Sequence, residues 1–116
     1  MVTITKAGRL AFNRAATEVL EREGGKYANL YWDPETRSVA VQPILQPEPQ
    51  AYQIAFGAKG NGAGFSVKSF LDYIVYESSV TRNFSTVWNA SAARFEFSMP
   101  AEAFLLRDAD DSKRSA

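Results

Sequence analysis

Three basic residues come before the first acidic residue of the chain. They are Lys6, Arg9 and Arg14. Lysine and arginine neutralise phosphates, and the free backbone amides at a helix N-terminus also favour anions. Arg14 would lie in the first turn of a helix capped by Asn13, where a cation opposes the helix dipole and so does not stabilise the helix. The cluster therefore predicts contact with a nucleic-acid backbone, and the alternative is an ordinary solvated surface.

Two further lysines follow a similar pattern later in the chain. Lys59 lies in a glycine-rich stretch over residues 57–64, and Lys68 lies just after it. The stretch lacks the Gly-Lys-Ser/Thr ending of a phosphate loop, and Asn61-Gly62 is typical of a hairpin turn. By pseudo-symmetry with the basic residues of the first half, Lys59 and Lys68 are predicted to form a weaker second nucleic-acid-binding patch.

The composition gives little support for a catalytic site or a metal-binding site. The chain has no cysteine and no histidine, which excludes thiolate sites and the commonest acid–base group and transition-metal ligand. Asp108, Asp110 and Asp111 are of a type that binds hard cations, but they stand in a small, charged tail without periodicity. We expect no catalytic residues, no metal site and no cofactor, and thus a protein that is not an enzyme.

Aromatic residues make up 13% of the chain, and they allow two interpretations. Rings beside Arg or Lys on an open sheet can stack unpaired bases. Alternatively, the rings fill a core: Tyr27 and Tyr31 alternate in phase along one strand, and Phe95 and Phe97 along another. A buried sheet face requires the same alternation, and we favour the core interpretation.

Length and charge limit the remaining choices. With 116 residues, 46% of them hydrophobic, the chain has the usual size of one domain, predicted over residues 1–107. Residues 108–116 are expected to be a disordered tail. The formal net charge is zero, so any attraction to nucleic acid must be local. No apolar run has the length of a membrane span, and we expect a cytoplasmic protein without a membrane partner.

The elements that would position these residues form a pattern that occurs twice. Alternation over residues 2–12 predicts a hairpin with its turn at Ala7-Gly8, and Asn13 begins a helix that Gly24-Gly25 ends. In the second copy, residues 52–56 form a strand, and Ser66 caps a helix through Val75.

Each predicted helix is followed by two strands around a polar turn. The first strand ends at a tryptophan, Trp32 or Trp88, and the second reads Arg-x5-Pro over residues 37–43 or 94–100. The longer strands of the second copy are predicted over residues 81–88 and 93–98.

The sequence thus predicts an α+β fold of two tandem ββαββ repeats, 1–43 and 52–100, joined by a proline-rich connector over residues 43–50. The repeats would form an antiparallel sheet or a small barrel with two short helices.

About forty residues of the first half carry a resemblance to a known family. The resemblance spans residues 4–43 and rests on the segments 4–14, 24–31 and 37–43. They resemble the AbrB/SpoVT-type swapped-hairpin domain, in which a Lys-Gly-Arg hairpin leads to a short helix and a glycine-rich turn precedes a strand. Two departures are Asn13 in place of the usual proline and the extra Ala7 between Lys6 and Gly8. The resemblance implies DNA binding through the basic hairpin and a homodimer, whereas a two-repeat chain would close the barrel alone.

These observations favour a nucleic-acid-binding protein, resembling a transcriptional regulator or an antitoxin, with duplex DNA preferred over a single strand. The alternative is a non-enzymatic protein-interaction module that uses the glycine-rich hairpin and the C-terminal segment 104–106. A third interpretation, a Whirly-like single-strand binder, would use the aromatic residues.

Overall fold

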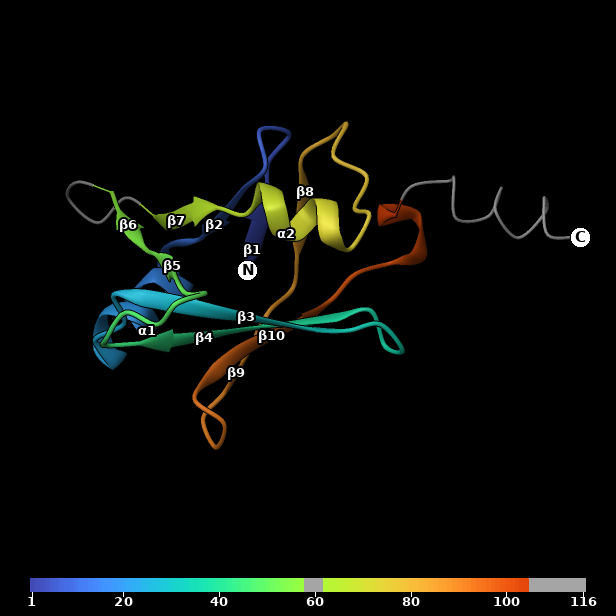
Figure 1. The fold of residues 1–116 in the computed structure, drawn as a ribbon. Coiled ribbons are helices and arrows are strands. Elements are labelled where there is room, and N and C mark those ends of the chain that lie inside the picture. Colours follow the sequence, from blue (N-terminus) through green and yellow to red (C-terminus); the bar gives the residue numbers. More distant parts are fainter. Residues whose placement is uncertain (58–61, 105–116) are drawn as a thin grey trace, which may run out of the picture.

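The chain forms two antiparallel sheets of five strands (Figure 1). Aromatic rings from the two sheets meet in the core between them. The structure is a computed structural model that describes residues 1–57 and 62–104. Sheet A has the strand order β6-β7-β2-β1-β8, and sheet B has the order β5-β3-β4-β10-β9. The predicted α+β class with antiparallel sheet is confirmed.

Both sheets consist of short strands; along the chain the first α-helix connects sheet A to sheet B, whereas the second connects two strands of sheet A. The strands of sheet A are β1 (Val2–Ile4), β2 (Arg9–Phe12), β6 (Ala55–Phe56), β7 (Ala63–Ser66) and β8 (Arg82–Phe84). The strands of sheet B are β3 (Tyr27–Asp33), β4 (Ser38–Ile44), β5 (Tyr52–Gln53), β9 (Val87–Asn89) and β10 (Arg94–Ser98). The described helices are α1 (Arg14–Glu23), α2 (Lys68–Tyr73) and the 3-10 helix η2 (Ala101–Ala103).

The predicted hairpins are present. β1 pairs with β2, β3 with β4, and β9 with β10, all antiparallel. Alternation explains the register, because Val2 and Ile4 of β1 and Leu10 and Phe12 of β2 are all buried on one face. The side chains that alternate with them, on the opposite face of these two strands, face the solvent.

Two segments that the sequence predicts as single strands are each divided between the sheets. β5 belongs to sheet B and β6 to sheet A, with only the buried Ile54 between them. Likewise β8 lies in sheet A and β9 in sheet B, with Ser85 and Thr86 at the bend. The prediction of one strand over 81–88 is therefore wrong in this respect. A bend allows one run of chain to border both faces of a common core, and local alternation does not reveal it.

Helix α1 has the predicted boundaries. The side chain of Asn13 accepts a hydrogen bond of 3.0 Å from the amide of Ala16, as an N-cap does. At the other end Gly24 takes a left-handed conformation (φ 71°), and the Gly25 amide donates to the Leu20 carbonyl at 3.0 Å. These contacts form a Schellman motif.

Helix α2 begins one residue later than predicted and is shorter. Ser66 was the expected cap, but it is the last residue of β7 and pairs with Arg9 of β2. Val67 occupies the N-cap and makes no side-chain capping bond. The prediction for Ser66 is wrong because sheet pairing keeps its backbone extended. The helix then ends at Tyr73.

The C-terminus of α2 has the same hydrogen-bond pattern as the C-terminus of α1, although it contains no glycine. The Tyr76 amide donates to the Leu71 carbonyl at 2.9 Å, and the Val75 amide to the Asp72 carbonyl at 3.2 Å. Val75 holds the left-handed position with φ 57°. A β-branched residue there is strained, because its side chain crowds the backbone.

The core lies between the sheets and is rich in phenylalanine. The rings of Phe12 in sheet A and Phe95 in sheet B have centroids 5.4 Å apart, and Phe84 and Phe97 form a second such pair, also at 5.4 Å. Phe95 and Phe97 are buried, so the core interpretation of their alternation is confirmed. The same interpretation is wrong for Tyr31, which is 46% exposed because it lies on the outer face of sheet B. Aromatic contacts of this kind hold the inner faces together.

Candidate nucleic-acid interface

The turn between β1 and β2 places Lys6 at the tip of a hairpin. The Thr5 amide donates to the Arg9 carbonyl and the Gly8 amide to the Thr5 carbonyl, each at 2.9 Å. A three-residue loop of this kind needs a left-handed last residue, and Gly8 supplies it with φ 83°. The Lys6 amide donates to Thr81 Oγ1 at 3.2 Å, which ties the loop to the chain entering β8. The side chain of Lys6 is exposed.

Arg9 is the first residue of β2 and points away from the core. Its sheet partner on β7 is Ser66, which is also exposed. A Cβ placed on Gly64 of β7 would lie 2.9 Å from Arg9 Nη2. The guanidinium group therefore extends sideways over the neighbouring strand, in space that glycine at position 64 leaves open.

Lys68 is brought to the same end of sheet A. It is the first residue of α2, and a Cβ placed on Gly8 would lie 2.5 Å from its Cγ atom. The Val67 amide donates to the Gly8 carbonyl at 2.8 Å, so the start of α2 is bonded to the hairpin loop. We call the exposed side chains of Lys6, Arg9 and Lys68 the basic patch.

The outer face of sheet A beside the patch has no carboxylate among the described strand residues. Strand alternation and pairing identify its outward residues. They are Thr3, Arg9, Ala11, Ala55, Gly64, Ser66 and Asn83. All except Arg9 are small or neutral. An anion approaching this face would meet cations and polar groups without a nearby acidic side chain from these strands.

Arg14 lies elsewhere. It begins α1, beyond the end of β2 that is opposite to the hairpin loop, and its side chain is 85% exposed. Its Nε atom is 3.7 Å from Glu18 Oε2, one helical turn away. An exposed pair of this kind contributes little to stability, but the carboxylate offsets part of the positive charge. Lys59, the remaining predicted site residue, lies outside the described residues.

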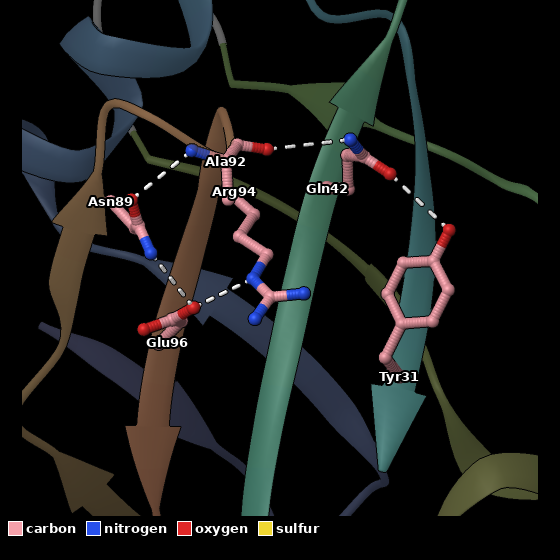
Figure 2. A network of polar contacts seen from close by, with 6 residues as sticks. All are labelled: Tyr31, Gln42, Asn89, Ala92, Arg94 and Glu96. Atoms are coloured by element: carbon pink, nitrogen blue, oxygen red, sulfur yellow. Dashed lines mark hydrogen bonds and ion pairs between the residues drawn. The ribbon is translucent and has the colours of Figure 1, made fainter.

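A hydrogen-bond network crosses the outer face of sheet B (Figure 2). Tyr31 Oη donates to Gln42 Oε1 at 3.2 Å. Glu96 Oε2 accepts from Arg94 Nε at 2.6 Å and from Asn89 Nδ2 at 3.2 Å. These two hydrogen bonds hold the pKa of the Glu96 carboxyl below its usual value. The Glu96 carboxylate thus offsets the charge of Arg94 on this face, whereas Arg9 on sheet A has no acidic neighbour among the described strand residues.

The protein-interaction alternative assigns partner binding to the C-terminal segment 104–106, but part of this segment packs against the core. Phe104 packs on Trp32 with ring centroids 5.6 Å apart and meets Tyr76 edge-on at 6.5 Å. Leu105 and Leu106 lie outside the described residues. Phe104 therefore contributes to the fold itself.

Sequence reasoning misses Gly64, Ser66 and Thr81, which shape the surface around the basic patch. The local pattern indicates a hairpin tip for Gly64, a helix cap for Ser66 and an ordinary strand residue for Thr81. Their roles depend on the pairing of β2 with β7 and on the approach of the loop to residue 81. No local pattern reports such long-range contacts.

The comparisons with protein-family models, curated proteins and solved structures give no match. In residues 1–57 and 62–104, no group of three or more His, Cys, Asp or Glu side chains is arranged to hold a metal ion. In the same part of the chain no helix has the length and apolar character needed to span a membrane.

Proposed function

We propose that this protein binds nucleic acid and that the basic patch contacts the phosphates. The observation that carries the proposal is the exposure of Lys6, Arg9 and Lys68 around one hairpin, beside a sheet face whose described strands contribute no carboxylate. Such a surface attracts phosphate although the formal net charge of the chain is zero. Neutralising phosphates releases counterions, so the affinity would depend on salt.

Duplex DNA is the proposed ligand. Single-strand binding relies on aromatic rings that stack bases, and the described outward residues of sheet A include none. The β1–β2 loop also stands at the edge of the molecule, away from sheet B (Figure 1). A projecting basic hairpin suits contact with the backbone of a duplex, where phosphates position the protein.

We also propose that the fold consists of two ββαββ repeats, as the sequence pattern predicts. The strand pairing supports this proposal. β2 pairs with β7 and β4 with β10, so like elements of the two halves meet. In addition β1 pairs with β8, and β5 with β3, so the first strand of each half borders the third strand of the other. This exchange would close a barrel within one chain.

The ends of the helices support the same proposal. Each helix follows directly on the second strand of its half, and each ends in a Schellman motif, with Gly24 in α1 and Val75 in α2. The hairpins β3–β4 and β9–β10 both place a left-handed residue just before the returning strand, Arg37 and Ala93. When the two halves are aligned on these left-handed residues, Arg37 corresponds to Ala93. The sequence pattern instead aligns Arg37 with Arg94, one residue further along the chain. With the basic hairpin, these features favour a regulator-like or antitoxin-like DNA-binding factor of the AbrB type.

The test is a binding measurement with a fluorescent DNA duplex at several salt concentrations. The triple variant K6A/R9A/K68A should bind more weakly, and its log–log salt slope should fall by about 0.9 for each phosphate that the variant no longer neutralises. The matched control is R14A/R22A/K26A, which removes the same charge from exposed residues around α1. Equally weakened binding in both variants, or no binding by the wild type at low salt, would refute the proposal.

A further inference from the structure

A groove lies on the side of the molecule where α2 meets sheet B. It has a volume of about 580 Å³ and is bordered by β3, by the segment 48–52 and by α2. Its size falls in the range of sites that hold a few side chains or a small ligand. The basic patch shares no residue with this groove, and the network on sheet B shares only Tyr31, whose hydroxyl donates to Gln42.

Aromatic rings line the groove and remain open to solvent. Tyr73 of α2 is 77% exposed and Tyr31 of β3 is 46% exposed. Tyr52 and Phe70 are half-buried at the floor, and the Tyr52 ring stacks on the core residue Phe65 with centroids 5.3 Å apart. Rings as exposed as Tyr31 and Tyr73 contribute little to the core, and they offer faces to a ligand.

Among the described residues, the groove has one charged lining residue, and that residue is acidic. Glu48 Oε1 accepts a hydrogen bond of 2.8 Å from Asn29 Nδ2, which holds the carboxylate at the rim. Aromatic faces attract cations through the ring quadrupole, and the carboxylate adds an opposite charge. The same carboxylate repels phosphate, so this groove does not suit a nucleic-acid backbone.

We propose that this groove binds an arginine side chain of a peptide segment from a partner protein. A guanidinium group is planar, stacks on tyrosine faces and pairs with a carboxylate through two hydrogen bonds. Tyr73 and Tyr31 supply the faces, and Glu48 supplies the carboxylate. This inference is independent of the nucleic-acid proposal, because the basic patch and the groove share no residue.

The experiment measures fluorescence anisotropy of a labelled Gly-Ser peptide that carries two arginines. A second peptide carries citrulline in place of arginine, which keeps the shape and removes the charge. The wild-type protein should bind the arginine peptide at least tenfold more tightly than the citrulline peptide. Tyr73→Ala should weaken binding about two- to fivefold, as expected for an exposed cation–π contact, and Tyr73→Phe should retain it.

Two controls separate the groove from general charge effects. Glu48→Gln should weaken binding of the arginine peptide, whereas Glu35→Gln, an exposed carboxylate in the β3–β4 turn, should leave it unchanged. The variant K6A/R9A/K68A should bind the peptide as the wild type does. Equal binding of both peptides, or equal effects of Glu48→Gln and Glu35→Gln, would overturn the proposal. Displacement of the peptide by a single-stranded oligonucleotide, abolished in Tyr73→Ala, would assign the groove to nucleic acid instead.

Discussion

The side chain of Lys68 lies directly against Gly8, although the two residues are far apart in the sequence. A Cβ placed on Gly8 would be 2.5 Å from Lys68 Cγ, and the backbone at Gly8 is left-handed with φ 83°. Both the turn and the packing of α2 therefore require glycine at this position. Through this contact the start of α2, with Lys68, packs against the hairpin loop that carries Lys6.

Gly8→Ala should destabilise the protein by about 1–3 kcal/mol, because alanine is strained at positive φ and its methyl group displaces Lys68. Chemical denaturation of the wild type and the variant measures the difference. The double variant Gly8→Ala/Lys68→Ala separates the two causes. If the clash contributes, Gly8→Ala will cost less in the Lys68→Ala background than in the wild type; equal costs would leave backbone strain alone.

Val75→Gly should stabilise the protein by about 0.5–1 kcal/mol, after allowing for the packing of the valine side chain, because glycine relieves the left-handed strain at the end of α2. The matched control is Gly24→Val at the corresponding position of α1, which should destabilise by about 1–2 kcal/mol. Thermal unfolding of both variants tests the pair of predictions. Lower stability in Val75→Gly would mean that the packing of the valine outweighs its strain.

Stability should fall at acid pH in part through Glu77. Hydrogen bonds from Ser79 and from the Arg82 guanidinium, which is 3.1 Å from Glu77 Oε1, hold the Glu77 pKa below the usual 4.5. A depressed carboxyl pKa stabilises the fold above the unfolded-state value, and this contribution is lost as the pH falls through the folded-state pKa. The wild type should therefore lose stability below about pH 4.5.

Glu77→Gln tests this account, since glutamine does not titrate. Urea denaturation between pH 3 and pH 7 should show a shallower acid destabilisation for Glu77→Gln than for the wild type. Glu96, whose pKa is lowered by Arg94 and Asn89, contributes with the same sign. Glu77→Gln/Glu96→Gln should therefore be flatter still, and curves parallel to the wild type would contradict both assignments.

Thr17→Val should cost about 1–3 kcal/mol although valine has nearly the same shape. Thr17 is 2% exposed, and its hydroxyl accepts a hydrogen bond of 3.0 Å from the Ala63 amide and donates to the Phe12 carbonyl at 3.4 Å. Valine leaves the buried amide without a partner. Thr17→Ser keeps the hydroxyl and should retain more stability in the same denaturant titration. The reverse order would show that the methyl group matters more than the hydrogen bond.

Local features of the sequence explain the parts of the fold that were predicted correctly. The alternation in residues 2–12 and 93–98, the Asn13 cap and the Gly24 terminator each depend on neighbours a few residues away. Hydrophobic periodicity and capping therefore identify these elements without knowledge of the tertiary contacts. The absence of cysteine and histidine likewise restricts the chemistry of any site without reference to the fold.

The tertiary structure alone decided which charges and rings come together. Ser66 was expected to cap a helix, but pairing with Arg9 keeps it in a strand, and the runs 52–56 and 81–88 bend from one sheet to the other. Lys68 joins the hairpin loop, whereas Arg14 remains with Glu18 on α1. These outcomes depend on contacts between residues distant in sequence. The energies of these long-range contacts compete with the local conformational preferences of the chain. Patterns among neighbouring residues report only those local preferences.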